Sequence, residues 1–345
     1  MGNAERPLIA THSAAGVALR GNFTSYAVVN LATLPNLKLP KFKLRNLKKK
    51  KNQYSELWQR ELFSHAPEYA AEFAGTAFLM FAVIGAVAWM FAPGSPVVHW
   101  IPLTPLRLFL TGLLLGGTGS LVAISPLGRI SGAHLNPAMS LGFFAAGTMQ
   151  VHDLIGYIAA QLSGASLGAW IAQAVFGAFG KMVHEALNQP GKAATPFLSV
   201  AAEAVATFVL AAVVFAMLSR RSLMRWTPLA LVGVVGVIVW LDGNFSGASL
   251  NPARSFGPAV VTEDWHQYWI YILGPCSGSV LAALLHRFAT PLEALTGKLF
   301  HDVRYRSIFK GKADHHANDS LRRRTAAPPE SRPVIFDHAN RAIHE

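Results

Sequence analysis

The chain has 345 residues, of which 52% are hydrophobic and only 14% are charged, and its formal net charge is +12. The hydrophobic residues are concentrated in runs of roughly 20, and this pattern argues against a soluble protein. The single cysteine, Cys276, excludes an intrachain disulfide.

The first 66 residues form a basic tail with eleven Lys and Arg against three Asp and Glu, and most of this charge lies in the run Lys38–Lys51. Residues 291–345 carry ten basic residues against seven acidic ones. Because the charge is concentrated at the two ends, we expect no nucleic-acid partner. The positive-inside rule instead predicts that the N-terminal tail, residues 1–66, and the C-terminal tail, residues 291–345, both lie in the cytoplasm. The composition of residues 1–66 predicts a disordered tail. The basic run can also contact anionic lipid heads.

Between the tails, residues 67–290 contain six apolar runs near the ~20 residues that a helix needs to cross a bilayer. The fifth run is the shortest, and Thr227-Pro228 at its start suits a helix cap followed by a first-turn proline. The sequence therefore predicts an all-α membrane protein with six transmembrane helices. The predicted spans are Ala70–Phe91, Leu106–Ile124, Leu154–Ala178, Phe197–Leu218, Pro228–Leu241 and Tyr268–Phe288.

The two halves of this region, about 67–180 and 195–290, repeat each other. AAEFAGTAFL, starting at Ala70, resembles AAEAVATFVL, starting at Ala201, and SGAHLNPA, starting at Ser131, matches SGASLNPA, starting at Ser246. Each half holds three spans, which is an odd number. The second copy must therefore enter the membrane from the opposite face, and this predicts an inverted repeat about a two-fold axis in the membrane plane.

The two NPA phrases follow the second and fifth spans, so they lie in loops on opposite faces. The stretches after them, MSLGFFAAG and RSFGPAVV, are too short to cross the membrane. We expect two re-entrant half-helices that meet near the midplane. Non-helical backbone at that depth is tolerated only where protein or a watery cavity covers it, so a watery path is expected at the centre.

Asn136-Pro137 and Asn251-Pro252 suit the first residues of the half-helices, with Asn as the cap and Pro at the first helical position. The two carboxamides would then present N–H donors at the positive ends of two opposed helices, while the preceding loop residues present carbonyl acceptors. This arrangement suits passage of small uncharged molecules that form hydrogen bonds, and it disfavours cations and hydronium.

Arg254 breaks the repeat, because it follows only the second NPA phrase. Its five donors can replace the hydration shell of a permeating molecule, and its charge opposes cations, although it could also fasten a loop through a salt bridge. Glu72 and Glu203 occupy equivalent positions in the two halves. They are interpreted as buried acceptors for loop N–H groups, with a proton relay as the alternative. His134 is interpreted as a loop brace, and no metal ligands or cofactors are predicted.

Three pairs of glycines have GxxxG spacing, which suits close helix crossing. They are Gly112/Gly116, Gly164/Gly168 and Gly274/Gly278. Three classes of function are compatible with these patterns: a passive channel, a secondary transporter of a small solute, and a structural membrane protein with a closed pore. An enzyme is not expected, because no constellation of nucleophile and base or of metal ligands is present.

Two NPA boxes in the context SGAxLNPA, Arg254 after the second box and the AEFxGT start of the first span together resemble the major intrinsic protein family, the aquaporins and glycerol facilitators. The resemblance covers about Glu68 to Phe288. It implies six helices and two half-helices with a pore in each protomer, usually in a homotetramer in a cell membrane, either inner or plasma. Asn136, Asn251 and Arg254 match the family motif directly.

The resemblance also implies a narrowest point built from four positions, which here are Gly116, Val239, Ala248 and Arg254. A shift of one residue would place Trp240 there instead of Val239. Water channels typically carry an aromatic residue at the first position and His at the second, and both are missing. The expected function is passage of water and of neutral solutes the size of glycerol or urea, with exclusion of protons and ions.

Overall fold

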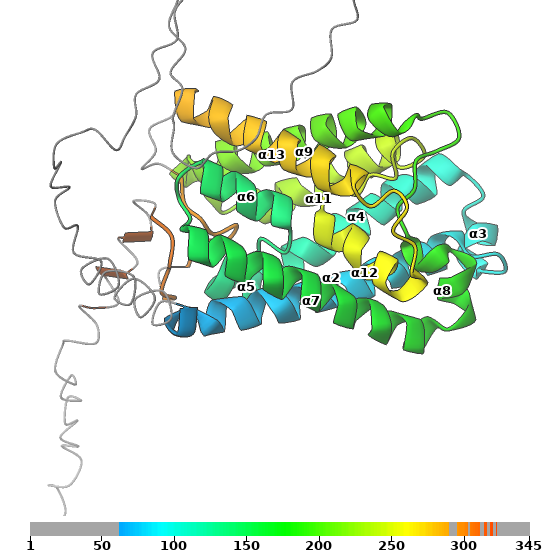
Figure 1. The fold of residues 1–345 in the computed structure, drawn as a ribbon, viewed down its shortest axis with the longest axis horizontal. Helices are drawn as coiled ribbons and strands as arrows, with labels where there is room; N and C mark the ends of the chain where they lie inside the picture. The colour runs from blue at the N-terminus through cyan, green and yellow to red at the C-terminus, as the bar shows by residue number, and fades with distance from the viewer. Residues whose placement is uncertain are drawn as a thin grey trace, which may run out of the picture. The chain divides into compact units, whose positions relative to one another are not determined.

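The computed structural model describes residues 62–289 and, towards the C-terminus, residues 295–302, 304–310, 314–315, 318–319 and 322 (Figure 1). The basic run Lys38–Lys51 and most of the predicted tails therefore lie outside the described residues. Within the described part every regular element is a helix, as the sequence predicts.

Five helices are long and apolar enough to cross a membrane, namely α2 (Ala66–Phe91), α4 (Thr104–Ile124), α7 (Val151–Phe176), α9 (Pro196–Leu218) and α13 (Ile270–Ala289). The sixth, α11 (Thr227–Asp242), has 16 residues and spans about 24 Å. Each helix lies within four residues of its predicted span. The all-helical membrane fold is thus confirmed, with α11 as its short member.

Short helices connect these spans. They are α3 (Pro96–Trp100), α5 (Pro126–Ser131), α8 (Ala178–Met182), the 3-10 helix η2 (His184–Ala186) and α10 (Arg221–Met224). Pro126 ends α4 and begins α5, because proline cannot continue a helix but suits its first turn. The predicted half-helices are also present, as α6 (Pro137–Ala145) and α12 (Pro252–Thr262).

The packing follows the inverted repeat. α2 packs along α7, and their counterparts α9 and α13 pack along each other, while α4 packs against its own counterpart α11 (Figure 1). α6 contacts α13, and α12 contacts α7, so each half-helix packs against a helix of the other half of the repeat. This exchange brings the two half-helices into one shared core.

The glycine pairs lie at these helix crossings. A Cβ atom at Gly168 would lie 2.2 Å from the carbonyl oxygen of Ala77, and one at Gly278 would lie 2.0 Å from that of Ala204. No side chain fits at such distances, so glycine is required for α7 to approach α2 and for α13 to approach α9. The outer faces carry exposed apolar side chains such as Leu121, Val205 and Leu229, each more than 60% exposed, which suit contact with lipid.

Candidate functional site: a channel between two half-helices

The first turns of the two half-helices are fixed by their own asparagines. Asn136 Oδ1 accepts a hydrogen bond from the Ala138 N–H at 2.8 Å, and Asn251 Oδ1 accepts one from the Ala253 N–H at 2.9 Å. Pro137 and Pro252 each occupy the first helical position, where the missing N–H is not needed. Each carboxamide therefore caps its helix and turns its NH2 group away from it.

The two caps are cross-connected. Asn136 Nδ2 donates to the Leu250 carbonyl oxygen, and Asn251 Nδ2 donates to the Leu135 carbonyl oxygen, both at 2.8 Å. Residues more than 110 positions apart in the sequence are thereby joined by a pair of equivalent bonds. An amide NH2 has two hydrogens, so one donor on each asparagine remains for a permeating molecule.

The loops before the half-helices share one unusual backbone path. Gly132, Ala133 and Leu135 have φ values of 95°, 56° and 51°, and their counterparts Gly247, Ala248 and Leu250 have 97°, 45° and 61°. Non-glycine residues rarely adopt these left-handed conformations, which cost of order 1–3 kcal/mol each. Such a path persists only when the surrounding structure holds it in both halves.

Glu72 holds the first loop. Its Oε1 accepts from Ser131 Oγ at 2.7 Å and from the His134 N–H at 2.9 Å, and its Oε2 accepts from the Leu135 N–H and from Gln161 Nε2, both at 2.7 Å. The carboxylate is completely buried. Four donors thus converge on one side chain, and this set of bonds stabilises the left-handed path.

Glu203 holds the second loop in the same way, with one donor fewer. Its Oε1 accepts from Ser246 Oγ at 2.9 Å and from the Ser249 N–H at 2.7 Å, and its Oε2 accepts from the Leu250 N–H at 2.8 Å. The repeat led to the interpretation of both glutamates as acceptors for loop N–H groups, and in the structure both lie within hydrogen-bonding distance of these groups.

Arg254 is held by the loop 184–188, which no sequence motif indicates. Its Nη1 donates to the Ala186 carbonyl oxygen at 2.6 Å and to Asn188 Oδ1. Asn188 Oδ1 also accepts from Ser255 Oγ at 2.8 Å, and its Nδ2 donates to the Gly247 carbonyl oxygen at 2.7 Å. The acceptors are a backbone oxygen and an amide, so the positive charge of Arg254 is not neutralised by these contacts.

The Ala186 carbonyl is presented by an uncommon turn. His184, Glu185 and Ala186 have φ values of 49°, 51° and 59°, three consecutive non-glycine residues in the left-handed region. No glycine marks this turn in the sequence, so sequence patterns give no sign of it. Its strain is a local cost of positioning Arg254.

A cavity of about 120 Å³ lies between the half-helices and the surrounding spans. All six residues that the sequence predicts to contact a permeant line this cavity, namely Gly116, Asn136, Val239, Ala248, Asn251 and Arg254. Leu79, Val83, Leu210 and Val214 contribute apolar wall. Trp240 is 47% exposed and does not line it, so Val239 is the residue of this pair that faces the cavity.

Gly116 also lies at the crossing of α4 and α11. A Cβ atom there would lie 2.9 Å from the Leu231 carbonyl oxygen and 2.9 Å from Val232 Cα. Any side chain at Gly116 would therefore push the two helices apart before it reached the cavity. The small size of Gly116 serves helix packing as well as the width of the cavity.

His134 connects the first loop to the C-terminal part of the chain. Its Nδ1 lies 3.0 Å from Ser140 Oγ, and its Nε2 lies 2.9 Å from the Gly297 carbonyl oxygen. Its ring stacks on Phe143 and on Phe309. His134 thus contacts both α6 and the segment after α13.

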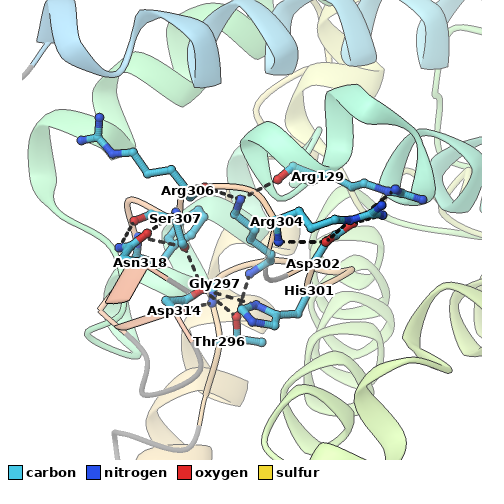
Figure 2. A network of polar contacts seen from close by, with 12 residues as sticks. Arg129, Thr296, Gly297, His301, Asp302, Arg304, Arg306, Ser307, Asp314 and Asn318 are labelled. Atoms are coloured by element: carbon cyan, nitrogen blue, oxygen red, sulfur yellow. Dashed lines mark hydrogen bonds and ion pairs between the residues drawn. The ribbon is translucent and has the colours of Figure 1, made fainter. Parts of the chain in front are cut away.

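Residues 295–302 and 304–310, here called the C-terminal segment, pack at the end of the bundle formed by α5 and the starts of α2 and α7 (Figure 1). Figure 2 shows the polar network that holds it. Asp314 accepts from Thr296 Oγ1 at 2.9 Å, from the Gly297 N–H at 3.2 Å and from Ser307 Oγ at 2.7 Å. The sequence predicts a tail at these residues, and nothing in their composition indicates these contacts.

Two charged groups of the C-terminal segment, Lys298 and Asp302, have pKa values below the usual range. Lys298 is buried and donates through Nζ to the carbonyl oxygens of Arg129 and Arg306, and burial lowers its pKa to about 8 although the Asp314 carboxylate acts in the opposite direction. Asp302 accepts hydrogen bonds from Arg304, which lower the pKa of its carboxyl to about 2, and it also pairs with Arg129 at 3.2 Å. Burial of Lys298 thus opposes docking of the segment, and the ion pair between Asp302 and Arg129 favours it.

Comparison with known proteins agrees with this architecture. Residues 59–286 match the family described as major intrinsic protein. The chain is 36% identical over 224 residues to the probable aquaporin TIP2-2 of Oryza sativa subsp. japonica, covering 64% of this chain and 86% of that protein. It is 34% identical over 250 residues to aquaporin AqpM of Methanothermobacter marburgensis, covering 64% of this chain and 96% of that protein.

The fold is likewise similar to the X-ray structure of the aquaglyceroporin from Plasmodium falciparum, with a TM-score of 0.54 and 24% sequence identity, covering 66% of this chain and 98% of that chain. The sequence match, the paired NPA caps and the inverted repeat lead to one assignment. The chain belongs to the major intrinsic protein family, whose members are membrane channels for water and small solutes and not enzymes.

Proposed function

We propose that the chain is a passive channel for water and for small uncharged solutes the size of glycerol or urea, and that it excludes protons and other ions. The observation that carries the proposal is the pair of cross-connected asparagines at the cavity wall. Each has one N–H committed to the opposite loop and one left for a permeating oxygen. The relatives described above that carry the name aquaporin support passage of water.

The character of the wall supports a solute larger than water. Val239 and Ala248 are small apolar residues on the cavity wall, with Arg254 as a strong donor beside them. A wall of this kind suits a molecule that has both a carbon face and a hydroxyl or amide group. Gly116 adds no side chain that would narrow the path.

Two features support exclusion of ions. The half-helices α6 and α12 direct their N-terminal ends, which carry partial positive charge, towards the cavity centre. Arg254 adds a full positive charge that its neighbours Ala186 and Asn188 leave uncompensated. A cation would have to pass the two helix ends and Arg254, and the described residues that line the cavity include no carboxylate.

The surroundings of the channel are part of the same proposal. We place residues 67–290 as the channel domain in a cell membrane, assembled as a homotetramer, with residues 1–66 and 291–345 on the cytoplasmic side. The exposed apolar faces support contact with lipid and with neighbouring protomers. The excess of Lys and Arg at the chain ends supports the orientation.

A secondary transporter remains the competing function, because inverted repeats and broken helices occur in both classes. Flux measurements separate the two. A channel shows no saturation at low millimolar solute and needs no ion gradient, whereas a coupled transporter saturates and follows the gradient.

The test uses the purified full chain in liposomes and compares water, glycerol and urea fluxes by stopped-flow light scattering. Water flux should exceed that of empty vesicles, with glycerol or urea also permeating. Val239→Trp should reduce solute flux about tenfold, and water flux less, because the larger side chain narrows the path; a tenfold change corresponds to about 1.4 kcal/mol in the barrier. Trp240→Val is the matched control, since Trp240 lies outside the cavity wall, and it should leave the flux ratio unchanged. Exclusion of both solutes by the unmodified chain would contradict the proposed width.

A further inference from the structure

The mouth of the channel beside α5, here called the α5 mouth, is crossed by the C-terminal segment. Leu299 of this segment lines the same cavity as Asn136 and Asn251, although every other lining residue belongs to the transmembrane helices, the half-helices or the loops before them. The Leu299 side chain is buried, and its N–H donates to the Gly132 carbonyl oxygen at 3.0 Å. The segment thus reaches the channel path itself.

The two mouths differ in this respect. At the Arg254 end, the carbonyl oxygen of Gly247, the counterpart of Gly132, accepts from the side chain of Asn188. Asn188 does not line the central cavity, so this bond adds no side chain to the cavity wall. At the α5 mouth the equivalent bond is donated by the Leu299 N–H to the Gly132 carbonyl oxygen, and the apolar Leu299 side chain lines the cavity. Leu299 is therefore an addition to the channel that the inverted repeat does not require.

The anchoring of the segment combines favourable and unfavourable contributions. The Gly297 carbonyl oxygen accepts from His134, and Asp314 holds Thr296 and Gly297. Leu295 and Leu299 are buried, and removal of their apolar side chains from water favours docking as well. Against this, docking removes the Lys298 ammonium from water, at a cost only partly offset by two carbonyl acceptors. Opposing contributions of this kind allow docking and release.

We propose that residues 295–302 form a cap that restricts flux through the α5 mouth, with Leu299 as the side chain that narrows the path. The proposal rests on the channel function proposed above and adds its regulation. Release of the cap, by loss of its anchors, would widen the mouth and would leave the Gly132 carbonyl oxygen and the His134 ring of the first NPA loop without their partners in the segment.

The cap is tested in the full chain in liposomes with three variants. Leu299→Ala should raise water flux about two- to tenfold over the unmodified chain, a change in barrier of roughly 0.4–1.4 kcal/mol. Leu299→Trp should lower it. Leu295→Ala removes a similar buried side chain of the same segment that does not line the cavity, so it should raise flux less.

These outcomes distinguish the cap from the channel function. Equal flux in the unmodified chain, Leu299→Ala and Leu299→Trp would overturn the cap and leave the channel standing. Lower flux in all three variants would also overturn it, because a purely structural role predicts that result. No flux in any of the proteins, including Leu299→Ala, would instead contradict the channel function.

An independent observation concerns a buried cluster of His65, His152 and Asp153 near the starts of α2 and α7. One ligand atom from each residue lies within 4.8 Å of the others. His65 Nδ1 lies 2.6 Å from Asp153 Oδ1, and His152 Nε2 lies 3.5 Å from Asp153 Oδ2. His65 and Asp153 are 88 positions apart in the sequence, so spacing gives no sign of this group.

The geometry of the cluster suits a transition-metal ion. Ligand bonds of about 2.0–2.1 Å in a tetrahedron place neighbouring donor atoms roughly 3.3 Å apart, close to the separation of His152 Nε2 and Asp153 Oδ2. The 2.6 Å contact between His65 Nδ1 and Asp153 Oδ1 is a hydrogen bond, which a bound ion would replace. Among the described residues Asp153 Oδ2 accepts no hydrogen bond, although it is buried. Tyr69 OH donates to Asp153 Oδ1 at 2.8 Å and orients the carboxylate, as outer contacts do in metal sites.

Among the described residues, His65 also lines a cavity of about 730 Å³ that it shares with residues 306–310 of the C-terminal segment, which gives room for a water ligand. We infer that His65, His152 and Asp153 form a binding site for a divalent transition-metal ion of the zinc class, with water as the fourth ligand. Bound metal would join the start of α2 to the start of α7.

Calorimetric titration of the purified full chain with ZnCl2 tests this site. About one ion per protomer should bind and raise the melting temperature, and Mg²⁺ should not compete, because nitrogen ligands favour zinc. His152→Ala and Asp153→Asn should lose the binding, whereas His99→Ala, at an exposed histidine, should retain it. Unchanged zinc binding in both cluster variants, or no saturable binding to the unmodified chain, would overturn the site. Melting curves recorded without metal identify any variant that fails to fold.

Discussion

Glu72→Gln is expected to lower the melting temperature of the purified protein and to reduce its water flux, and Glu203→Gln is expected to do so less. Each glutamine can place only one acceptor oxygen where the glutamate has two. Its NH2 group must then face a backbone N–H of the loop, and leaving a buried N–H without an acceptor costs about 1–3 kcal/mol. At Glu72 the contact from Gln161 is disturbed as well, whereas Glu203 Oε2 has a single donor, Leu250.

Differential scanning fluorimetry and stopped-flow flux measurements on the same preparations check this expectation. Glu263→Gln is the control, since Glu263 is exposed and contacts neither loop, and it should change neither quantity. Full thermal stability in both Gln variants, combined with loss of proton-dependent transport, would contradict the anchor role. That result would favour the alternative in which Glu72 and Glu203 relay protons.

Arg254→Val is expected to admit protons or K⁺ through a channel that otherwise conducts only neutral molecules. A unit charge near the path contributes about 4 kcal/mol to the barrier for a cation at 4 Å and an effective dielectric constant of 20. The half-helix ends of α6 and α12 remain in the variant, so part of the barrier is retained. We expect a cation leak at least about tenfold above that of the unmodified chain.

Current measurements in planar bilayers and pH-dye assays in liposomes check this outcome. Arg225→Val removes an exposed arginine between α10 and α11 and should leave the ion barrier intact. A substantial K⁺ current in the unmodified chain would contradict the mechanism. Unchanged exclusion in Arg254→Val would assign the whole barrier to the helix ends.

Local chemistry explains why much of the channel could be predicted from the sequence. An apolar run of about 20 residues has few alternatives to a membrane helix, because every backbone group must be paired within the bilayer. Asn136-Pro137 and Asn251-Pro252 specify helix starts through the cap and the missing proline N–H, and both half-helices begin as predicted. The repeat of SGAxLNPA then fixes the pairing of the halves, because an odd number of spans inverts the second copy.

Some features of the site are decided only by tertiary packing. Val239 and Trp240 are adjacent and both compatible with a wall position, and only the rotation of α11 against α4 turns Val239 inwards. The left-handed turn that presents the Ala186 carbonyl to Arg254 contains no glycine. Its strain is supported by long-range contacts, which leave no local pattern.

The sequence by itself therefore determined the spans, the half-helices and the residues that repeat or break the symmetry, because hydrophobic length, helix caps and inversion are local or periodic properties. Only the tertiary structure decided the contacts between distant segments. It placed Leu299 in the channel wall, Gly116 against the α11 backbone, and His65 beside Asp153. These contacts depend on which surfaces meet after folding, and the local sequence around a residue does not specify its distant partner.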